Sequence, residues 1–124
     1  MLGDMPRPDP ESFLPLKPDA VLVLLALASQ PLHGYGIIRD VSERSSGAVR
    51  LQTGALYRLL RTLLLDGLVR ETDRPRDAMN DDERRRYYAL TTLGEAVLAA
   101  EVERMARLVR AARLVAQGKR PQLA

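Results

Sequence analysis

The spacing of apolar residues along this 124-residue chain predicts four helices. Every position from Ala20 to Ala28 is apolar, and Pro18 with Asp19 suits a helix start, so a buried central helix is expected there. Further apolar residues at helical spacing predict three more helices, and prolines or glycines mark several of their ends. The four helices are expected at about residues 19–30, 34–45, 52–66 and 91–117.

Short segments rich in β-forming residues lie between these helices and predict a small β-hairpin. Val69 to Asp73 is expected to be one strand and Arg86 to Leu90 the returning strand, with the polar loop 74–84 between them. Ala48 to Leu51 predicts a third, very short strand. The fold class is therefore mainly α with a small β-hairpin. The order of elements is that of a winged helix-turn-helix followed by a long C-terminal helix.

The chain divides into four expected parts. Prolines crowd residues 1–17, which disfavours a helix and favours an extended arm. Phe13, Leu14 and Leu16 lie in this arm, so it either packs on the body or a second subunit, or is a disordered leader. Residues 18–90 are the expected winged helix-turn-helix domain, 91–117 the expected dimerisation helix and 118–124 a tail.

The third predicted helix has an outer face that suits contact with DNA. Four leucines gather on its inner side, whereas the outer side is basic and the whole segment from Val49 to Leu65 contains no acidic residue. Carboxylates there would be repelled by phosphates, and the free amides of the helix start can bind one. Leu65 is an exception, because it falls on the outer side. The predicted DNA contacts are Arg50, Gln52, Thr53, Gly54, Tyr57, Arg58 and Arg61.

The loop of the predicted hairpin carries charges of both signs. Arg84 to Arg86 form a basic run, but Asp77 and the acidic run Asp81 to Glu83 directly precede it. Arg85 and Arg86 are therefore predicted to contact DNA only as an auxiliary to the third helix.

The last predicted helix carries an apolar seam with spacings of 4, 3, 4, 3 and 4 residues. This a/d pattern pairs helices. The stripe could instead pack on the chain's own core, but a helix of this length extends beyond so small a domain, which favours a homodimer. The predicted dimer contacts are Leu98, Val102, Met105, Val109, Ala112 and Ala116.

The composition argues against an enzyme. The chain has no cysteine and one histidine, His33, so imidazole and thiolate ligands for a transition metal cannot be assembled within one chain. His33 precedes a predicted helix, where a capping or packing role is expected. The acidic segment 77–83 lacks the glycine and spacing of a calcium loop, and there is no glycine-rich phosphate loop. No catalytic residue, metal or cofactor is expected.

Charge and hydropathy limit the setting. Nineteen Lys and Arg against 16 Asp and Glu give a formal net charge of +3, which is compatible with a nucleic-acid partner without requiring one. The longest apolar run is too short to cross a bilayer, and the N-terminus lacks the layout of a secretion signal. We therefore expect no membrane contact and a cytoplasmic location.

Three segments together resemble the PadR family of bacterial winged-helix transcriptional regulators. They are PLHGYGI at 31–37, GALYRLLRTLLLDGLV at 54–69 and RRRYYALTTLG at 84–94, and the resemblance covers about residues 16–109. It implies a homodimer that binds palindromic operator DNA, usually as a repressor. The residues that match the family pattern are Gly54, Tyr57 and Arg58 at the DNA-facing helix start, Gly67 in the turn, Tyr88 in the wing strand, and Thr91 with Gly94 at the entry to the dimer helix.

The chain also departs from this family. Thr53 stands where many relatives have proline, and Leu64 with Leu65 replaces residues that are often charged. Short members resembling this chain bind planar drugs in the dimer crevice by stacking on a tryptophan, and this chain has none. The effector is therefore left open, a cleft between the two last helices being the place expected for one. The alternative function is a winged-helix module for protein–protein contact without specific DNA binding.

Overall fold

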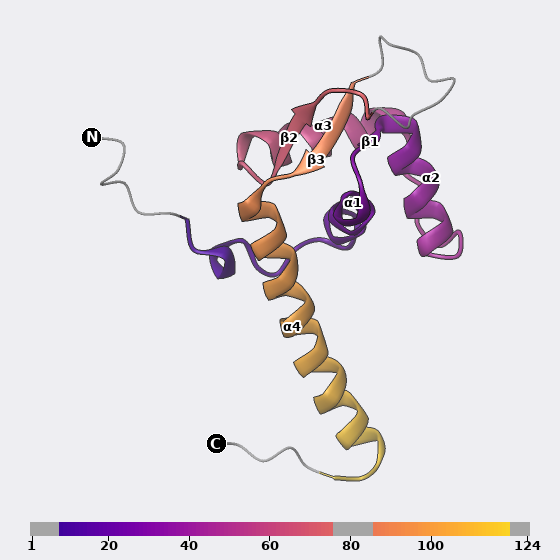
Figure 1. Cartoon of the computed structure of the whole chain (residues 1–124). Coiled ribbons are helices and arrows are strands. Elements are labelled where there is room, and N and C mark those ends of the chain that lie inside the picture. The colour runs from indigo at the N-terminus through magenta and orange to yellow at the C-terminus, as the bar shows by residue number, and fades with distance from the viewer. Residues whose placement is uncertain (1–7, 76–85, 120–124) are drawn as a thin grey trace, which may run out of the picture.

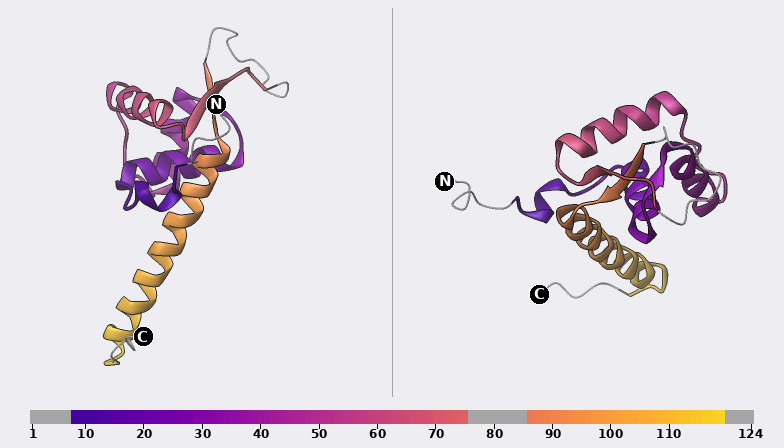
Figure 2. Two further views of the ribbon diagram at one scale, coloured as in Figure 1. Left: turned by 90° about the vertical axis from the view of Figure 1, so that its left-hand side faces the viewer. Right: turned by 45° about the horizontal axis from the view of Figure 1, so that its top comes forward.

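The computed structural model describes residues 8–75 and 86–119 (Figure 1). Helices dominate, and a small sheet lies between α3 and the start of α4 (Figures 1 and 2). The elements in chain order are the 3-10 turn η2 (Pro10–Phe13), α1 (Pro18–Ser29), β1 (Leu32–His33), α2 (Gly34–Arg44), α3 (Thr53–Leu65), β2 (Val69–Thr72), β3 (Tyr87–Leu90) and α4 (Thr92–Ala116).

The sheet is antiparallel with the strand order β1-β3-β2. The hairpin pairs Val69 with Leu90, as predicted, but the expected strand at Ala48 to Leu51 is wrong. The third strand is β1, in which Leu32 pairs with Tyr88. A two-residue strand depends on the edge it reaches, not on its own β propensity. The segment before α3 is instead held in a turn, where the Val49 N–H donates to Ser45 Oγ at 2.9 Å.

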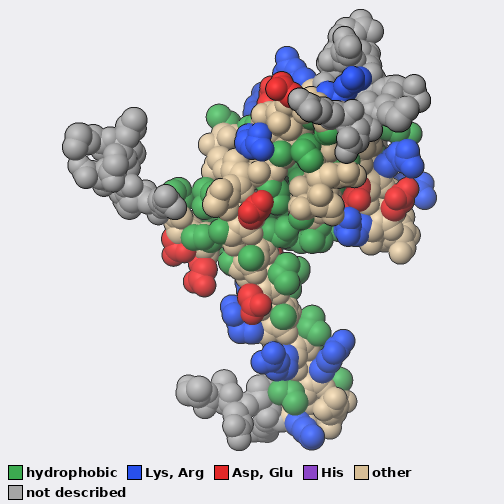
Figure 3. Space-filling view, in the orientation of Figure 1, with side chains coloured by type: hydrophobic (Ala, Val, Ile, Leu, Met, Phe, Trp, Pro, Cys, Tyr) green, Lys and Arg blue, Asp and Glu red, His purple; other side chains and the backbone are tan. Residues whose placement is uncertain are grey.

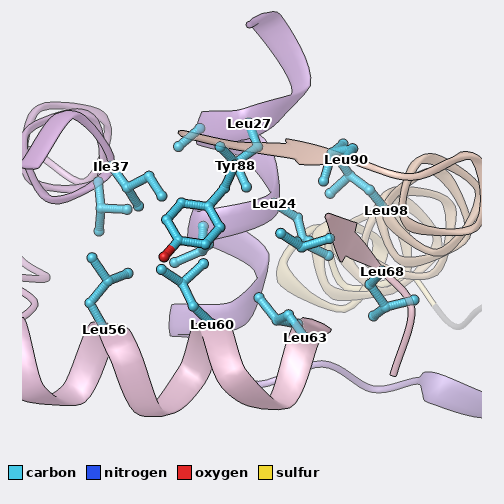
Figure 4. Packing of buried hydrophobic residues seen from close by; sticks show 14 of the residues in the cluster. Leu24, Leu27, Ile37, Leu56, Leu60, Leu63, Leu68, Tyr88, Leu90 and Leu98 are labelled. Carbon is cyan, nitrogen blue, oxygen red and sulfur yellow. The ribbon is translucent and has the colours of Figure 1, made fainter. Parts of the chain in front are cut away.

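The core forms around α1, as its all-apolar sequence predicted. Val23 and Leu24 of α1 are fully buried. The inner face of α3 is also confirmed, because Leu56, Leu60 and Leu63 are buried, and Figure 4 shows them pointing toward Tyr88 and Leu24. The remaining elements pack on the same core, because α2, α3 and the hairpin each place one apolar face on this cluster.

Helix α4 begins in the core and then leaves it (Figures 1 and 2). Its first turns bury Val97, Leu98 and Glu101, whereas no residue from 102 to 119 is buried. Thr91 is the N-cap, and its side chain accepts a hydrogen bond from Gly94 N–H at 2.9 Å.

The described part of the arm packs on the body. Pro10–Phe13 forms a single 3-10 turn, which proline at its first position permits, and the other residues from 8 to 17 are outside any helix or strand. Phe13, Leu14 and Leu16 are partly buried against the core. The backbone N–H of Leu16 also donates to Glu101 Oε2 on α4 at 2.7 Å.

Candidate DNA-binding surface

The outer face of α3 is built by the same helical spacing that buries its leucines. Gln52 is the N-cap in an extended conformation, and its carbonyl accepts the N–H of Leu56 at 2.9 Å. No side chain caps this helix start, so its first amides face outward. The predicted contact residues on and before α3 are all exposed: Arg50, Gln52, Thr53, Gly54, Tyr57, Arg58 and Arg61.

The charge of this face is positive and unopposed. Arg58 and Arg61 form no ion pair with any residue in the described part of the chain. The nearest acidic residue along the helix is Asp66, which is its C-cap. Leu65 lies at the same end with 82% of its surface exposed, so the outward position expected for it is confirmed. Both arginines are therefore available to an anionic partner.

Tyr57 lies on the flank of this face, against the start of α2. It is 48% exposed, and a Cβ placed on Gly34 would lie 2.7 Å from its hydroxyl oxygen. The Tyr57 ring can occupy this position because residue 34 is a glycine and has no side chain in its way. Sequence reasoning missed this contact. Gly34 at the start of the second predicted helix indicated a close contact, but Tyr57, which makes it, lies 23 positions later, and helical or strand spacing does not connect the two residues.

Behind this face, Tyr88 is buried at 3% exposure and packs in the core cluster. Burial is the main reason that the pKa of its hydroxyl is raised above its ordinary value, with smaller contributions from Tyr57 and Glu71. Tyr88 is thus a support for α3 and not part of the exposed surface.

The described part of the hairpin adds fewer exposed basic residues to the candidate surface than α3 does. Arg86 is exposed, and its guanidinium lies 3.6 Å from the carboxylate of Glu71 on the neighbouring strand. An exposed pair of this kind is weak, so Arg86 can exchange Glu71 for a phosphate. Arg85 and the acidic segment 77–83 lie outside the described residues.

The predicted seam on α4 divides into two parts. Leu98 is 8% exposed and packs in the domain's own core, whereas Val102 and Val109 are 44% and 47% exposed. Met105 is half-buried, and Ala112 and Ala116 are exposed. Figure 3 shows hydrophobic side chains alternating with arginines along the projecting part of the helix.

The predicted seam does not include two apolar residues of α4 that are exposed in the structure. Leu108 and Val115 are 60% and 65% exposed, and with Ala111 they form a second stripe of spacing 3 and 4 next to the first. The signal was present in the sequence, but a pattern limited to a and d positions excludes it. The apolar face beyond the core is therefore broader than predicted.

A sequence profile of the PadR-like family of transcriptional regulators matches residues 22–100. This chain belongs to the PadR-like family. The matched region contains most of α1, the sheet, α2, α3 and the first two turns of α4, which includes the whole candidate surface on α3.

Solved structures show the same fold as this PadR-like chain. A PadR-like regulator from Bacillus cereus has a TM-score of 0.68 at 18% identity, over 81% of this chain and 92% of that one. A PadR family regulator from Clostridium difficile has a TM-score of 0.62 at 21% identity, over 74% and 91%. These likenesses confirm the predicted fold class, a winged helix with a long C-terminal helix.

A sequence relative extends the comparison. An uncharacterised 37.1 kDa protein of a Streptomyces fradiae transposon is 41% identical over 88 residues, which is 71% of this chain and 23% of that protein. The PadR-like chain thus spans about a quarter of this relative's length.

The remaining predicted chemistry of the PadR-like chain is structural. His33 caps α2, because its Nδ1 accepts the Gly36 N–H at 3.1 Å, which confirms the expected capping role. In residues 8–75 and 86–119, no three His, Asp or Glu side chains are grouped to hold a metal ion. Within the same ranges, no helix is long and apolar enough to cross a membrane.

Proposed function

We propose that this PadR-like chain is a sequence-specific DNA-binding regulator that acts as a homodimeric repressor at a palindromic operator. The observation that carries the proposal is the exposed face of α3, which is basic, free of acidic residues, and rests on a buried leucine face. A helix with these properties suits the major groove. Membership of a family of transcriptional regulators supports the same role.

Each residue of the α3 surface has a part in this proposal. Arg58 and Arg61 are long enough to reach guanine edges or phosphates, where a guanidinium bonds in a bidentate manner. Gly54 leaves room for close approach of the DNA backbone. The uncapped amides after Gln52 bind a phosphate, and Thr53 and Arg50 flank them. Tyr57 contacts the backbone from the flank, and Arg86 with Arg85 adds contacts from the hairpin.

The proposed dimer forms through the part of α4 that leaves the core. Val102, Met105 and Val109 are the centre of the contact, and the stripe of Leu108 and Val115 widens it. Removal of such an apolar face from water favours association of two chains. Two joined chains present two α3 helices, which matches the two half-sites of a palindrome. Ala112 and Ala116 continue the proposed seam toward the end of α4, whereas Leu98, which the sequence pattern also placed in the seam, packs in the chain's own core.

The proposed effector site lies beside the seam. A hollow of about 420 Å³ beside the first turns of α4 is lined by Ala28, Leu90, Leu98, Ala99 and Val102 and by the two acidic residues Glu95 and Glu103. Pairing of two α4 helices would bring the hollow of each subunit toward the dimer crevice. The two carboxylates favour a ligand with a cationic group on an apolar body.

A gel-shift titration against the DNA upstream of the protein's own gene tests the main proposal. We expect a specific shift that weakens steeply as salt rises, because phosphate contacts release counterions. Repression is tested with the same DNA driving a reporter gene, whose expression should fall when the protein is present. A folded dimer that gives no specific shift at low salt would contradict DNA reading and favour a protein–protein module, with Leu65 and its neighbours as the contact.

A further inference from the structure

The end of α3 is bonded tightly to the turn that follows it. Gly67 has a φ of +76°, and its N–H donates to Leu64 O at 3.1 Å. The N–H of Leu68 donates to Leu63 O at 3.0 Å. These two bonds close the last turn of the helix in a Schellman arrangement. The Gly67–Leu68 turn therefore moves with α3 as one body.

Thr91 connects this turn to α4. Its hydroxyl donates to Gly67 O at 2.5 Å, and its backbone N–H donates to Leu68 O at 3.1 Å. The same hydroxyl oxygen accepts the N–H of Gly94 in the first turn of α4 at 2.9 Å. One side chain thus bonds the end of α3 and the start of α4 at the same time.

The two segments also touch with no space between them. Gly94 is buried, and a Cβ at this position would overlap the carbonyl oxygen of Leu68. Leu68 itself is 1% exposed and belongs to the core cluster, so its backbone cannot retreat without disturbing that packing. The junction is fixed by hydrogen bonds and by contact.

We infer that Thr91 is a positioning residue that sets the orientation of α3 relative to α4, and through it the operator half-site spacing that the dimer accepts. The inference rests on the proposed function, since α4 must join the two subunits and α3 must read DNA. In such a dimer the distance and angle between the two α3 helices depend on the α3–α4 junction of each chain. Thr91 acts on DNA only through this junction.

The consequence is a measurable dependence on spacing. One added base pair moves a half-site by about 3.4 Å and rotates it by about 34°. A rigid junction cannot follow this change without losing contacts, whereas a loosened junction can. The affinity for the best spacing and the affinity for altered spacings should therefore respond differently when the Thr91 bond to Gly67 is removed.

Three substitutions separate this bond from helix capping. Thr91→Ser keeps the hydroxyl and both of its bonds. Thr91→Asp keeps an acceptor for the Gly94 N–H, and aspartate is a good N-cap, but the carboxylate has no proton to donate to Gly67 O. Thr91→Val removes both bonds. Thr92→Val is the matched control, because Thr92 is exposed and its hydroxyl makes no hydrogen bond within the described part of the chain.

The experiment begins with selection of a palindromic site from random DNA by the full-length wild-type dimer. Fluorescence anisotropy then measures the affinity for that site and for versions with the spacer changed by one or two base pairs. We expect the wild type, Thr91→Ser and Thr92→Val to lose about tenfold or more in affinity per altered base pair. Thr91→Asp and Thr91→Val should lose only about threefold or less, with unchanged affinity for a single half-site.

The outcomes distinguish this inference from the proposed function. A wild-type protein that selects no palindrome, or that is monomeric by sedimentation, would overturn the proposed function itself. If the wild type selects a palindrome but Thr91→Asp keeps the full spacing penalty, the positioning role is wrong and Thr91 is only a cap. An equal loss of affinity at every spacing would also contradict it, because that pattern reports a general loss of folded protein.

Discussion

The backbone N–H of Leu16 donates a 2.7 Å hydrogen bond to Oε2 of Glu101, although the two residues are separated by 85 positions. Glu101 is fully buried, and its other carboxylate oxygen accepts a hydrogen bond from Arg104 Nε. This carboxylate therefore attaches the N-terminal arm to α4. A glutamate in the middle of a helix reads as a surface residue in sequence, so its burial depends on the arm that covers it.

Replacement of Glu101 should destabilise the fold. We expect Glu101→Gln to lower the free energy of unfolding by about 2 kcal/mol, because hydrogen bonds to a charged group contribute about 1.5–3 kcal/mol. Urea denaturation followed by circular dichroism measures this. Glu103→Gln is the control, since Glu103 is exposed on the same helix. Equal midpoints for the two variants would show that the arm is not attached through this carboxylate.

The same carboxylate predicts a loss of stability in acid. The hydrogen bond from Arg104 is the largest influence and lowers the pKa of Glu101 below its ordinary value of 4.5; burial opposes it and the Leu16 N–H assists it. A lowered folded-state pKa stabilises the fold fully above about pH 4.5 and progressively less as the pH falls toward the folded-state value. The difference between wild type and Glu101→Gln should therefore shrink in urea titrations from pH 7 to pH 3. A difference that grows in acid would reverse the assigned sign.

Gly34 should matter for DNA through Tyr57. In Gly34→Ala the new methyl group would lie against the Tyr57 hydroxyl and push the ring from its place. We expect operator affinity to fall about tenfold, or about 1.4 kcal/mol. Gly36→Ala is the matched control, because a Cβ there lies no closer than 3.4 Å to any neighbour. Anisotropy titration compares the two, and similar affinities would show that the Tyr57 position is unimportant for binding.

The arginines of α3 should differ from those elsewhere on the surface. Arg58→Ala and Arg61→Ala should each weaken operator binding by about 1–3 kcal/mol if the arginine reads a base, and reduce the salt slope by about one if it binds a phosphate. Arg39→Ala is the control, because Arg39 lies on α2 and pairs with Glu43 at 3.8 Å. Titrations at several salt concentrations separate the two roles, and an unchanged affinity for both α3 variants would move the DNA surface elsewhere.

The apolar face of α4 should hold two chains together. Met105→Glu places a charge in the proposed seam and should convert the dimer to monomer, because an unpaired charge is costly to bury. Sedimentation at micromolar concentration measures the change. Arg107→Glu also makes the helix more negative, but on its polar side, and should leave the dimer intact. A dimer that survives Met105→Glu would place the interface on another surface.

The pattern of the sequence alone was sufficient to predict the helices, the inner and outer faces of α3, and the glycine that ends α3. These features follow from contacts between residues a few positions apart, which leave a regular trace in the sequence. The apolar stripe beyond Leu98 is local in the same sense. The family resemblance added what such patterns cannot carry, which is the connection between this helix order and transcriptional regulation.

The remaining features depend on residues that meet only after folding. The strand Leu32–His33 forms because β3 offers it an edge, and Glu101 is buried because the arm crosses it. Gly34 has to be small because Tyr57 lies over it, and Thr91 can connect α3 with α4 because the turn after α3 reaches it. None of these partners lies within one or two helical turns of the other, so no spacing in the sequence could reveal them. Close packing of distant segments decided each one.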